Sequence, residues 1–433
     1  MSATLPNFAT NSAIRPARRP AAILPRGILS LGDLFCFLAP ALQFVQIQTV
    51  GTLLATDLAL LAALPIALLR HPERLRQKPV PTILALGIFW LLSQVATDLY
   101  RVSAPEDYLR GWIRIVLILV SFLVVWTVAC TSLRRFVLFN VGIAVGGILT
   151  LSLHPSEDMI FSPWKFGLAG PITMLVVTSV ACWAGRSRLA LLVPLVLLTV
   201  VHSYANTRSM ALICLLTAIF SLFHLSVGGT RRRVGGGRLA LLAGVGAVCI
   251  YGFMALYSHY AEQGAFGLYA QQKLEAQSGE GGMLLGGRSE ILASGQAILD
   301  SPLLGHGSWA RDPAYAAILE NSRAALGYKV FQYSKPDDLI PTHSHVFGSW
   351  VEAGLAGGVF WIFILYYVIS SLIKIRGGEP LLPLFAFMGF MLVWDILFSP
   401  ISPERRFVTP YFLAAMILLG QLRDPHSAEM EEK

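Results

Sequence analysis

The chain has 433 residues, of which 55% are hydrophobic and only 13% are charged. A mean hydropathy of +0.63, with about half the usual share of charged residues, excludes an ordinary soluble protein and indicates a polytopic membrane protein. The formal net charge of +8 does not indicate a nucleic-acid-binding surface, because most Lys and Arg residues lie in short connections between apolar segments.

The N-terminal segment 1–27 is basic and precedes an apolar run that lacks a small-residue cleavage site. We therefore expect a cytoplasmic tail and a retained first helix rather than a removed signal peptide. All cysteines of the chain lie inside apolar segments: Cys36, Cys130, Cys182, Cys214 and Cys249. This placement is typical of helix-packing residues and indicates neither a disulfide framework nor a cysteine metal site.

Apolar segments long enough to cross about 30 Å of hydrocarbon recur along the chain. They lie at roughly 28–46, 50–70, 80–98, 112–131, 136–153, 167–184, 189–204, 209–226, 239–258, 347–372, 381–398 and 407–422. We therefore predict an all-α polytopic membrane protein with about twelve transmembrane helices. The first group occupies 28–258 and the second 344–422, and a short cytoplasmic tail follows at 423–433.

Every second connection between these segments is rich in Arg or Lys. By the positive-inside rule, these connections and both termini face the cytoplasm. The segment 259–343 then faces outward as one large loop, with helices predicted near 261–278, 288–300 and 312–326. Because this loop cannot bury much core alone, we expect it to pack over the outer mouth of the bundle.

The end of this loop carries ionisable residues at the start of a hydrophobic helix. The sequence from Pro341 to Trp361 reads PTHSHVFGSWVEAGLAGGVFW and contains His343, His345 and Glu352. Ionisable groups at such a boundary are energetically costly and point to function. His343 is the candidate general base, because a neutral imidazole can remove a proton near pH 7; a structural histidine is the alternative. His345 and Glu352 are candidate substrate-binding residues. For Glu352 the alternatives are orientation of His343, binding of a neighbouring Arg, and a helix-packing hydrogen bond.

Basic residues on the outward side need another explanation, because the positive-inside rule does not account for them. Arg208 lies in a short turn at the start of an apolar helix, where the helix dipole favours anions. An interfacial arginine that reaches lipid head groups is the alternative. Arg288 follows two glycines and falls in a first helical turn, so an anion should compensate its charge. Either Glu290 or another carboxylate of the loop fills that role, or a ligand diphosphate does.

Further outward basic residues are lower-ranked candidates for substrate binding: Arg110, Arg114, Lys165 and Arg405. Arg110 and Arg114 lie four residues apart on one helical face and have nearby acidic residues as alternative partners. The outward loops contain no pair of aspartates spaced by one residue, as a diphosphate-bound metal ion would require. We therefore predict no metal and no other cofactor.

The spacing of His343, Gly354 and Gly357 resembles the signature of the O-antigen ligase and O-antigen polymerase superfamily. The turn around Arg208 and the helix that begins at Arg288 are similar to further patterns of that family. The resemblance covers mainly residues from about 200 to 360. It implies a GT-C-like membrane glycosyltransferase with undecaprenyl-diphosphate-linked glycans as donors. It also implies that both arginines hold the diphosphate and that His343 is the base of a metal-independent, inverting transfer.

The chain departs from the family at Ser344, where an Asn often follows the histidine, so no role of that Asn is carried over. The resemblance implies a bacterial inner membrane and polymerisation of an exported polysaccharide or O-antigen. Transfer of the glycan to a lipid A core or a protein, as in a ligase, is the alternative. Expected partners are the lipid-linked donor, a glycan or lipid A core acceptor, membrane lipids and other polysaccharide export proteins, but not nucleic acid. A polysaccharide or lipid transporter is the non-enzyme alternative, and it predicts broken helices near the midplane.

Overall fold

The computed structural model describes residues 28–183, 187–226, 236–328, 338–375 and 381–422. The tails predicted at 1–27 and 423–433 lie outside the described residues. The elements, in chain order, are α1 (Leu31–Ala41), η1 (Leu42–Phe44), β1 (Gln46–Thr49), β2 (Gly51–Leu54), α2 (Ala55–Arg70), α3 (Pro72–Leu75), α4 (Val80–Arg101), α5 (Pro105–Val128), η2 (Ala129–Thr131), α6 (Leu133–Leu153), α7 (Glu157–Phe161), η3 (Trp164–Leu168), α8 (Ala169–Trp183), α9 (Arg188–Tyr204), α10 (Arg208–Ser226), α11 (Gly236–Glu262), α12 (Leu268–Gln277), α13 (Gly282–Gly286), α14 (Glu290–Asp300), α15 (Pro313–Ala325), α16 (His345–Ala353), α17 (Leu355–Ile373), α18 (Leu382–Phe398) and α19 (Arg405–Gln421).

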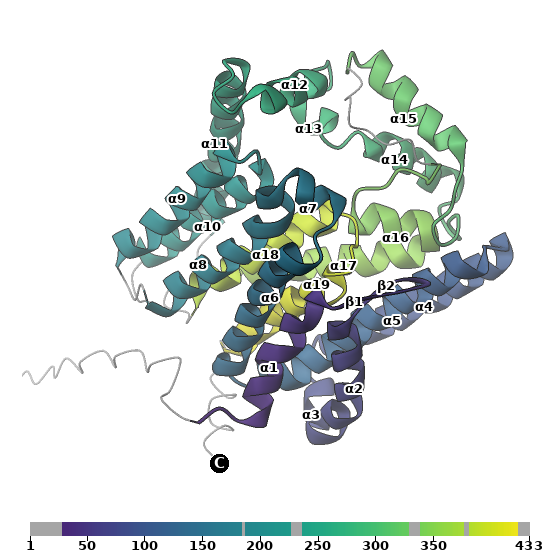
Figure 1. Ribbon diagram of the computed structural model, residues 1–433, viewed down its shortest axis with the longest axis vertical. Helices are drawn as coiled ribbons and strands as arrows, with labels where there is room; N and C mark the ends of the chain where they lie inside the picture. Colours follow the sequence, from purple (N-terminus) through teal and green to yellow (C-terminus); the bar gives the residue numbers. More distant parts are fainter. Residues whose placement is uncertain (1–27, 184–186, 227–235, 329–337, 376–380, 423–433) are drawn as a thin grey trace, which may run out of the picture.

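Apolar helices dominate this architecture (Figure 1). Within the described residues, 5 helical stretches are long and apolar enough to cross a membrane: Val80–Arg101, Pro105–Thr131, Leu133–Leu153, Trp164–Trp183 and Leu355–Ile373. Shorter apolar helices accompany them at Leu31–Phe44, Arg188–Tyr204, Arg208–His224 and Leu382–Phe398. The prediction of an all-α protein with membrane-length apolar helices is confirmed. The number of about twelve spans and their orientation stay predictions.

The helices divide into inner and outer members of the bundle. Helices α18 and α19 are buried along most of their length, and α5 packs against α19. Helices α9 and α11 instead expose large apolar side chains, including Val200 at 59% and Val248 at 72%. Apolar side chains on the outside of a helix bundle are suited to hydrocarbon rather than water. The outer face therefore fits a lipid environment.

The loop segment 259–343 contains short helices, as expected, although with different bounds. Helix α11 continues to Glu262, a break follows at Gly264 and Gly267, both with positive φ, and α12 begins at Leu268. Helices α13, α14 and α15 then follow. In Figure 1 this part of the chain arches over the ends of the bundle helices around α7, α16 and α18. The loop therefore covers one end of the bundle.

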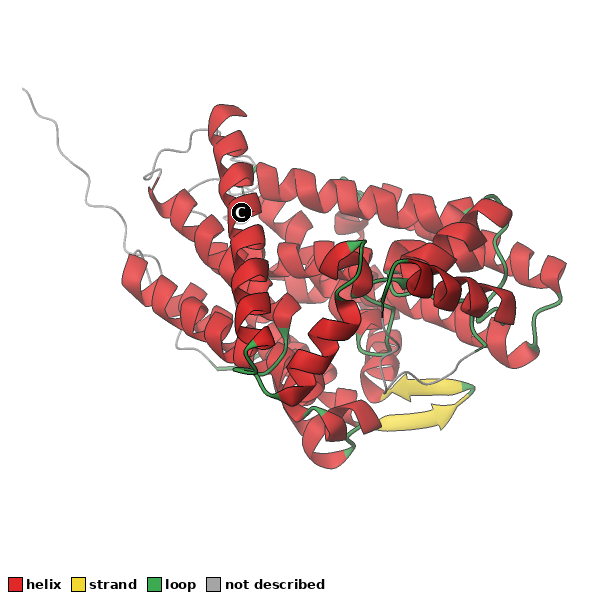
Figure 2. Cartoon of the chain, turned by 90° about the horizontal axis from the view of Figure 1, so that it is seen from above, coloured by secondary structure: helices red, strands yellow, loops and turns green. Residues whose placement is uncertain are grey.

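Two apolar segments differ from the prediction of one helix each. The segment 50–70 begins with β2, which forms an antiparallel hairpin with the preceding β1, and only α2 is helical (Figure 2). Gly51, with φ of 110°, makes the tight turn, and the alternating Gln46-Ile47-Gln48-Thr49 run suits a strand. The segment 347–372 is broken at Gly354, which separates α16 from α17.

Candidate functional site

His343 lies at the end of the loop, directly before α16, and its side chain is half-buried. Its neighbour Ser344 caps α16 by accepting a hydrogen bond from Phe347 N at 3.2 Å. Burial lowers the pKa of His343 below its ordinary value, and the positive charge of Arg288 lowers it further, whereas Glu290 raises it. The imidazole is therefore neutral at pH 7 and can accept a proton.

Arg288 lies at the junction between α13 and α14, close to His343. Its Nη1 donates to Gly287 O at 2.8 Å, and the guanidinium lies over the ring of Trp394 at 5.8 Å. Burial lowers the pKa of Arg288, Glu290 raises it, and the charge of Arg208 lowers it. The Nε atom of Arg288 is buried without a hydrogen-bond partner in the described part of the chain. The loop thus brings a cation toward α18.

Arg208, the first residue of α10, connects the bundle to the loop. Its guanidinium donates to Gln277 Oε1 at the end of α12 and lies 5.3 Å from the ring centre of Tyr257 on α11. The turn before it is fixed, because Tyr257 donates to Asn206 Oδ1 at 2.7 Å. Asn206 has a φ of 57°, which Asn tolerates better than most residues. These contacts hold α10, α11 and α12 together around Arg208.

Lys165 lies in η3, a π-helical turn at the start of α8. Trp164 anchors this turn, because its indole donates to Nδ1 of the buried His202 at 3.1 Å. The Lys165 ammonium is in side-chain contact with Lys273 on α12. Isolated π-helical turns are frequent at functional sites.

Lys273 was not predicted from the sequence, yet it belongs to the same group. Burial lowers its pKa to about 7, and the positive charges of Lys165, Arg208 and Arg288 contribute. In the sequence Lys273 lies in a polar helix, where a lysine is unremarkable. No local pattern marks it, since only the packing of α12 over the bundle brings it close to the other cations.

The basic side chains Lys165, Arg208, Lys273 and Arg288, which we call the basic cluster, come from the three helical elements η3, α10 and α12 and from the junction between α13 and α14. Glu290 acts on Arg288, and Asp158 acts on Lys165, with a negative charge in each case. Like charges held together in a half-buried place repel one another, and a bound anion relieves that repulsion. The cluster is therefore suited to bind a polyvalent anion next to His343.

Other predicted arginines have acidic partners. Arg114 forms an ion pair with Glu352, and both side chains are largely buried. Arg405 pairs with Asp395 on α18 and also lowers the pKa of His343. Each pair joins two helices, and the contact of Glu352 with Arg114 corresponds to the alternative in which Glu352 binds a neighbouring Arg.

Arg110 pairs with Glu106 at 3.8 Å and with Asp107 at 3.9 Å, as its position on α5 allowed. His345 is fully buried rather than facing a substrate cavity. Its Nδ1 lies 2.6 Å from Ser399 O, and its Nε2 lies 3.4 Å from Thr409 Oγ1. Its ring also packs edge-on against Trp361. The substrate-binding interpretation of His345 is therefore replaced by a structural one.

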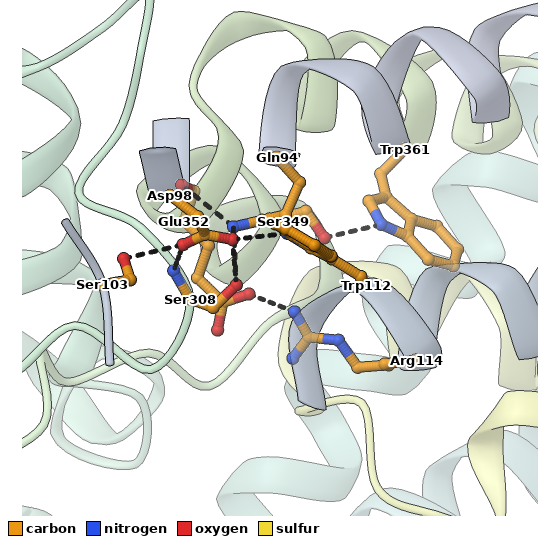
Figure 3. A network of polar contacts seen from close by, with 9 residues as sticks. All are labelled: Gln94, Asp98, Ser103, Trp112, Arg114, Ser308, Ser349, Glu352 and Trp361. Atoms are coloured by element: carbon orange, nitrogen blue, oxygen red, sulfur yellow. Dashed lines mark hydrogen bonds and ion pairs between the residues drawn. The ribbon is translucent and has the colours of Figure 1, made fainter. Parts of the chain in front are cut away.

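A buried carboxylate, Asp98 on α4, fixes the loop beside α16 (Figure 3). It accepts hydrogen bonds from Ser308 N at 2.6 Å, Ser308 Oγ at 2.7 Å and Trp112 Nε1 at 2.8 Å. Ser103 Oγ donates to it at 2.8 Å. Gln94 donates to Ser308 Oγ at 2.9 Å and thus joins the same network. This network attaches the segment between α14 and α15 to the bundle.

Among the described residues, no group of His, Cys, Asp or Glu side chains is placed to hold a metal ion. Comparison of the chain with protein-family models, with curated proteins and with solved structures finds no match.

Proposed function

We propose that this protein is an integral-membrane glycosyltransferase that transfers an undecaprenyl-diphosphate-linked oligosaccharide to an acceptor hydroxyl. The observation that carries the proposal is the position of the basic cluster beside the neutral imidazole of His343, at one end of a bundle of apolar helices. A lipid diphosphate needs such a place, because its tail lies in hydrocarbon and its charges lie at the membrane surface. The resemblance of the motif from His343 to Gly357 supports the same function.

Each residue of the proposed site has its own role in the transfer. His343 removes the proton from the acceptor hydroxyl as that oxygen attacks the anomeric carbon. The bond from the anomeric carbon to the diphosphate oxygen breaks, and its electron pair remains on the diphosphate. Arg208 and Arg288 donate forked, charge-assisted hydrogen bonds to this leaving group, and Lys165 and Lys273 add positive charge. Attack opposite the leaving group inverts the anomeric centre, and His343 then releases its proton to water.

Polymerisation of an exported polysaccharide or O-antigen is the form of the reaction that we propose. In this form the acceptor hydroxyl belongs to another lipid-linked unit. A ligase would instead transfer the glycan to a lipid A core or a protein. The two forms share the basic cluster and His343, so the acceptor distinguishes them.

The proposed location is a bacterial inner membrane, with both termini in the cytoplasm and the loop 259–343 in the periplasm. The excess of Arg and Lys in alternate connections supports this orientation. Lipid-linked glycans that are polymerised on the outer side of that membrane would then meet the basic cluster directly.

Incubation of the purified protein with undecaprenyl-diphosphate oligosaccharide tests the function. We expect a ladder of longer glycans without any other acceptor. Product that forms only after lipid A core is added would make the protein a ligase. No product in either mixture would contradict a glycosyltransferase.

Single substitutions test the assigned residues in the same assay. His343→Ala and Arg288→Ala should each lower the rate by at least about 100-fold, because they remove the base and a charge on the leaving group. The matched control is His154→Ala, since His154 is exposed at the end of α6 and should not affect the rate. Membrane levels of all variants, measured by immunoblot, should equal those of the wild type. Full activity of either site variant would refute its assignment.

A further inference from the structure

A cavity of about 250 Å³ lies next to the segment that carries His343. Thr342 and Ser344 line this cavity, and His343 stands between them in the chain. The charge of Arg288, a member of the basic cluster, acts on the imidazole of His343. The cavity and the basic cluster therefore both lie close to the proposed base.

The wall of the cavity combines an aromatic ring with charged and hydroxyl groups. Trp309 contributes an indole, and the Arg114 guanidinium lies 4.6 Å from its ring centre. Arg114 also forms the ion pair with Glu352, whose side chain is 15% exposed. The hydroxyl of Ser349 adds a further polar group. Such a wall offers an apolar face for C–H groups and charge-assisted hydrogen bonds for hydroxyl groups.

Trp309 has an unusual backbone conformation, with a φ of 49°. A bulky residue in the left-handed region is strained and persists only where the surrounding structure enforces it. Here Asp98 binds both the backbone and the hydroxyl of the preceding Ser308 (Figure 3). His306 N donates to Val351 O at 2.7 Å and Gly307 N donates to Glu352 O at 3.0 Å, which attaches the same segment to α16. These hydrogen bonds therefore hold the Trp309 indole at the cavity despite the free-energy cost of its left-handed backbone conformation.

A second cavity of about 110 Å³ adjoins the first. The two share Arg114, Trp309 and Ile401, and the second reaches the β1–β2 hairpin at Gly51 and Thr52. The larger cavity is slightly below the roughly 300–1,000 Å³ of typical ligand pockets. Its size fits the terminal sugar of a glycan rather than a lipid, and the adjoining cavity gives space for the next ring.

We propose that the cavity lined by Trp309, Arg114 and Glu352 binds the terminal sugar of the acceptor glycan. The ligand class rests on the proposed function, since a glycosyl transfer requires an acceptor hydroxyl near His343. The location rests on the strained indole, the ion pair and the position of the cavity against Thr342 and Ser344, the two chain neighbours of His343. Arg114 and Glu352 thus have a binding role in addition to their contact with each other.

The test measures glycan binding apart from catalysis. The probe is the free oligosaccharide that mild acid releases from the lipid-linked glycans of the native host membrane, titrated into detergent-purified protein by calorimetry. Trp309→Gly removes the indole and relieves the backbone strain, so it should raise the glycan Kd by about tenfold or more without lowering Tm. Ala310→Leu fills the cavity from its wall and should have the same effect on Kd. Trp183→Ala removes an exposed indole on α8 and is the matched control, with an unchanged Kd.

Binding of undecaprenyl diphosphate to the same samples separates this inference from the proposed function. Trp309→Gly and Ala310→Leu should leave the Kd for undecaprenyl diphosphate unchanged, whereas Arg288→Gln should raise it and leave glycan binding intact. A wild-type protein that binds undecaprenyl diphosphate but not the glycan would overturn the acceptor site alone. Glycan binding that survives both Trp309→Gly and Ala310→Leu, or that is lost in Arg288→Gln, would also overturn it.

Discussion

Lys273 is the residue of the basic cluster whose charge changes near neutral pH. Its ordinary pKa of 10.5 is lowered to about 7 by burial and by the charges of Lys165, Arg208 and Arg288. Between these two pH values the unfolded chain holds this proton more fully than the folded, ligand-free chain does. The contribution of Lys273 to folding stability therefore rises with pH. Anion binding has the opposite dependence, because an anion favours the charged lysine.

Because Lys273 loses its proton near pH 7 and an anion binds the protonated form, the affinity for an anionic ligand should depend on pH. The Kd for undecaprenyl diphosphate should rise as the pH increases from about 7, by at most about tenfold per pH unit for one proton. Lys273→Arg keeps the charge at every such pH and should make the curve flatter. The lipid diphosphate also titrates in this pH range, but it affects the Kd of both proteins equally. The difference between the Kd of the wild type and that of Lys273→Arg at each pH therefore reports on Lys273 alone. Parallel curves for wild type and Lys273→Arg would show that Lys273 does not contact the diphosphate.

Some of these residues are visible in the sequence and others are not. His343, Arg208 and Arg288 stand out because ionisable groups are costly next to long apolar segments. Lys273 does not stand out in a polar helix, and the left-handed conformation of Trp309 leaves no sequence signal, because it depends on Asp98 more than 200 residues away.

The junction between α16 and α17 shows why Gly354 is required at the end of the motif. Gly354 has a φ of 63°, and a Cβ at this position would lie 2.0 Å from Leu303 O. The backbone of the loop thus passes directly over the junction, and Leu355 N donates to the same Leu303 O at 3.2 Å. The absence of a side chain at Gly354 therefore lets the backbone of the loop at Leu303 pack directly against the end of α16.

Gly354→Ala should destabilise this junction by several kcal/mol, because a methyl group clashes with backbone that cannot rotate away. We expect a fall in Tm by several degrees in detergent and a parallel loss of transfer activity. Gly295→Ala in α14 is the matched control. No heavy atom lies within 4 Å of a Cβ there, so this change should leave Tm equal or raise it. Equal Tm values for Gly354→Ala and wild type would contradict the role of the junction.

At the scale of elements, the apolar segments predicted the helices because a helix satisfies its own backbone in hydrocarbon. The hairpin of β1 and β2 was missed, since its apolar residues read as the start of a helix until Gly51 turns the chain back. The break at Gly354 was missed because glycines also occur inside membrane helices. The hairpin lines the smaller of the two cavities, and the break at Gly354 follows Glu352, which lines the larger one.

The whole molecule consists of an apolar bundle with a polar arch over one end, and the proposed orientation follows from its charge distribution. Labelling of introduced cysteines with a membrane-impermeant maleimide tests it in intact cells. Gln296→Cys on the exposed side of α14 should react, and Glu73→Cys, exposed on α3, should react only after lysis. The reverse pattern would place the basic cluster in the cytoplasm.

In the proposed function, cations from separate parts of the chain hold a lipid diphosphate beside His343. The direct measurement is the Kd of undecaprenyl diphosphate for the purified wild type, for Arg208→Gln and for Arg288→Gln, with Arg70→Gln, exposed at the end of α2, as the control. We expect a Kd at least about tenfold higher for each of the first two variants, since each loses charge-assisted hydrogen bonds to phosphate, and an unchanged Kd for the control. Equal affinity in all four proteins would contradict it.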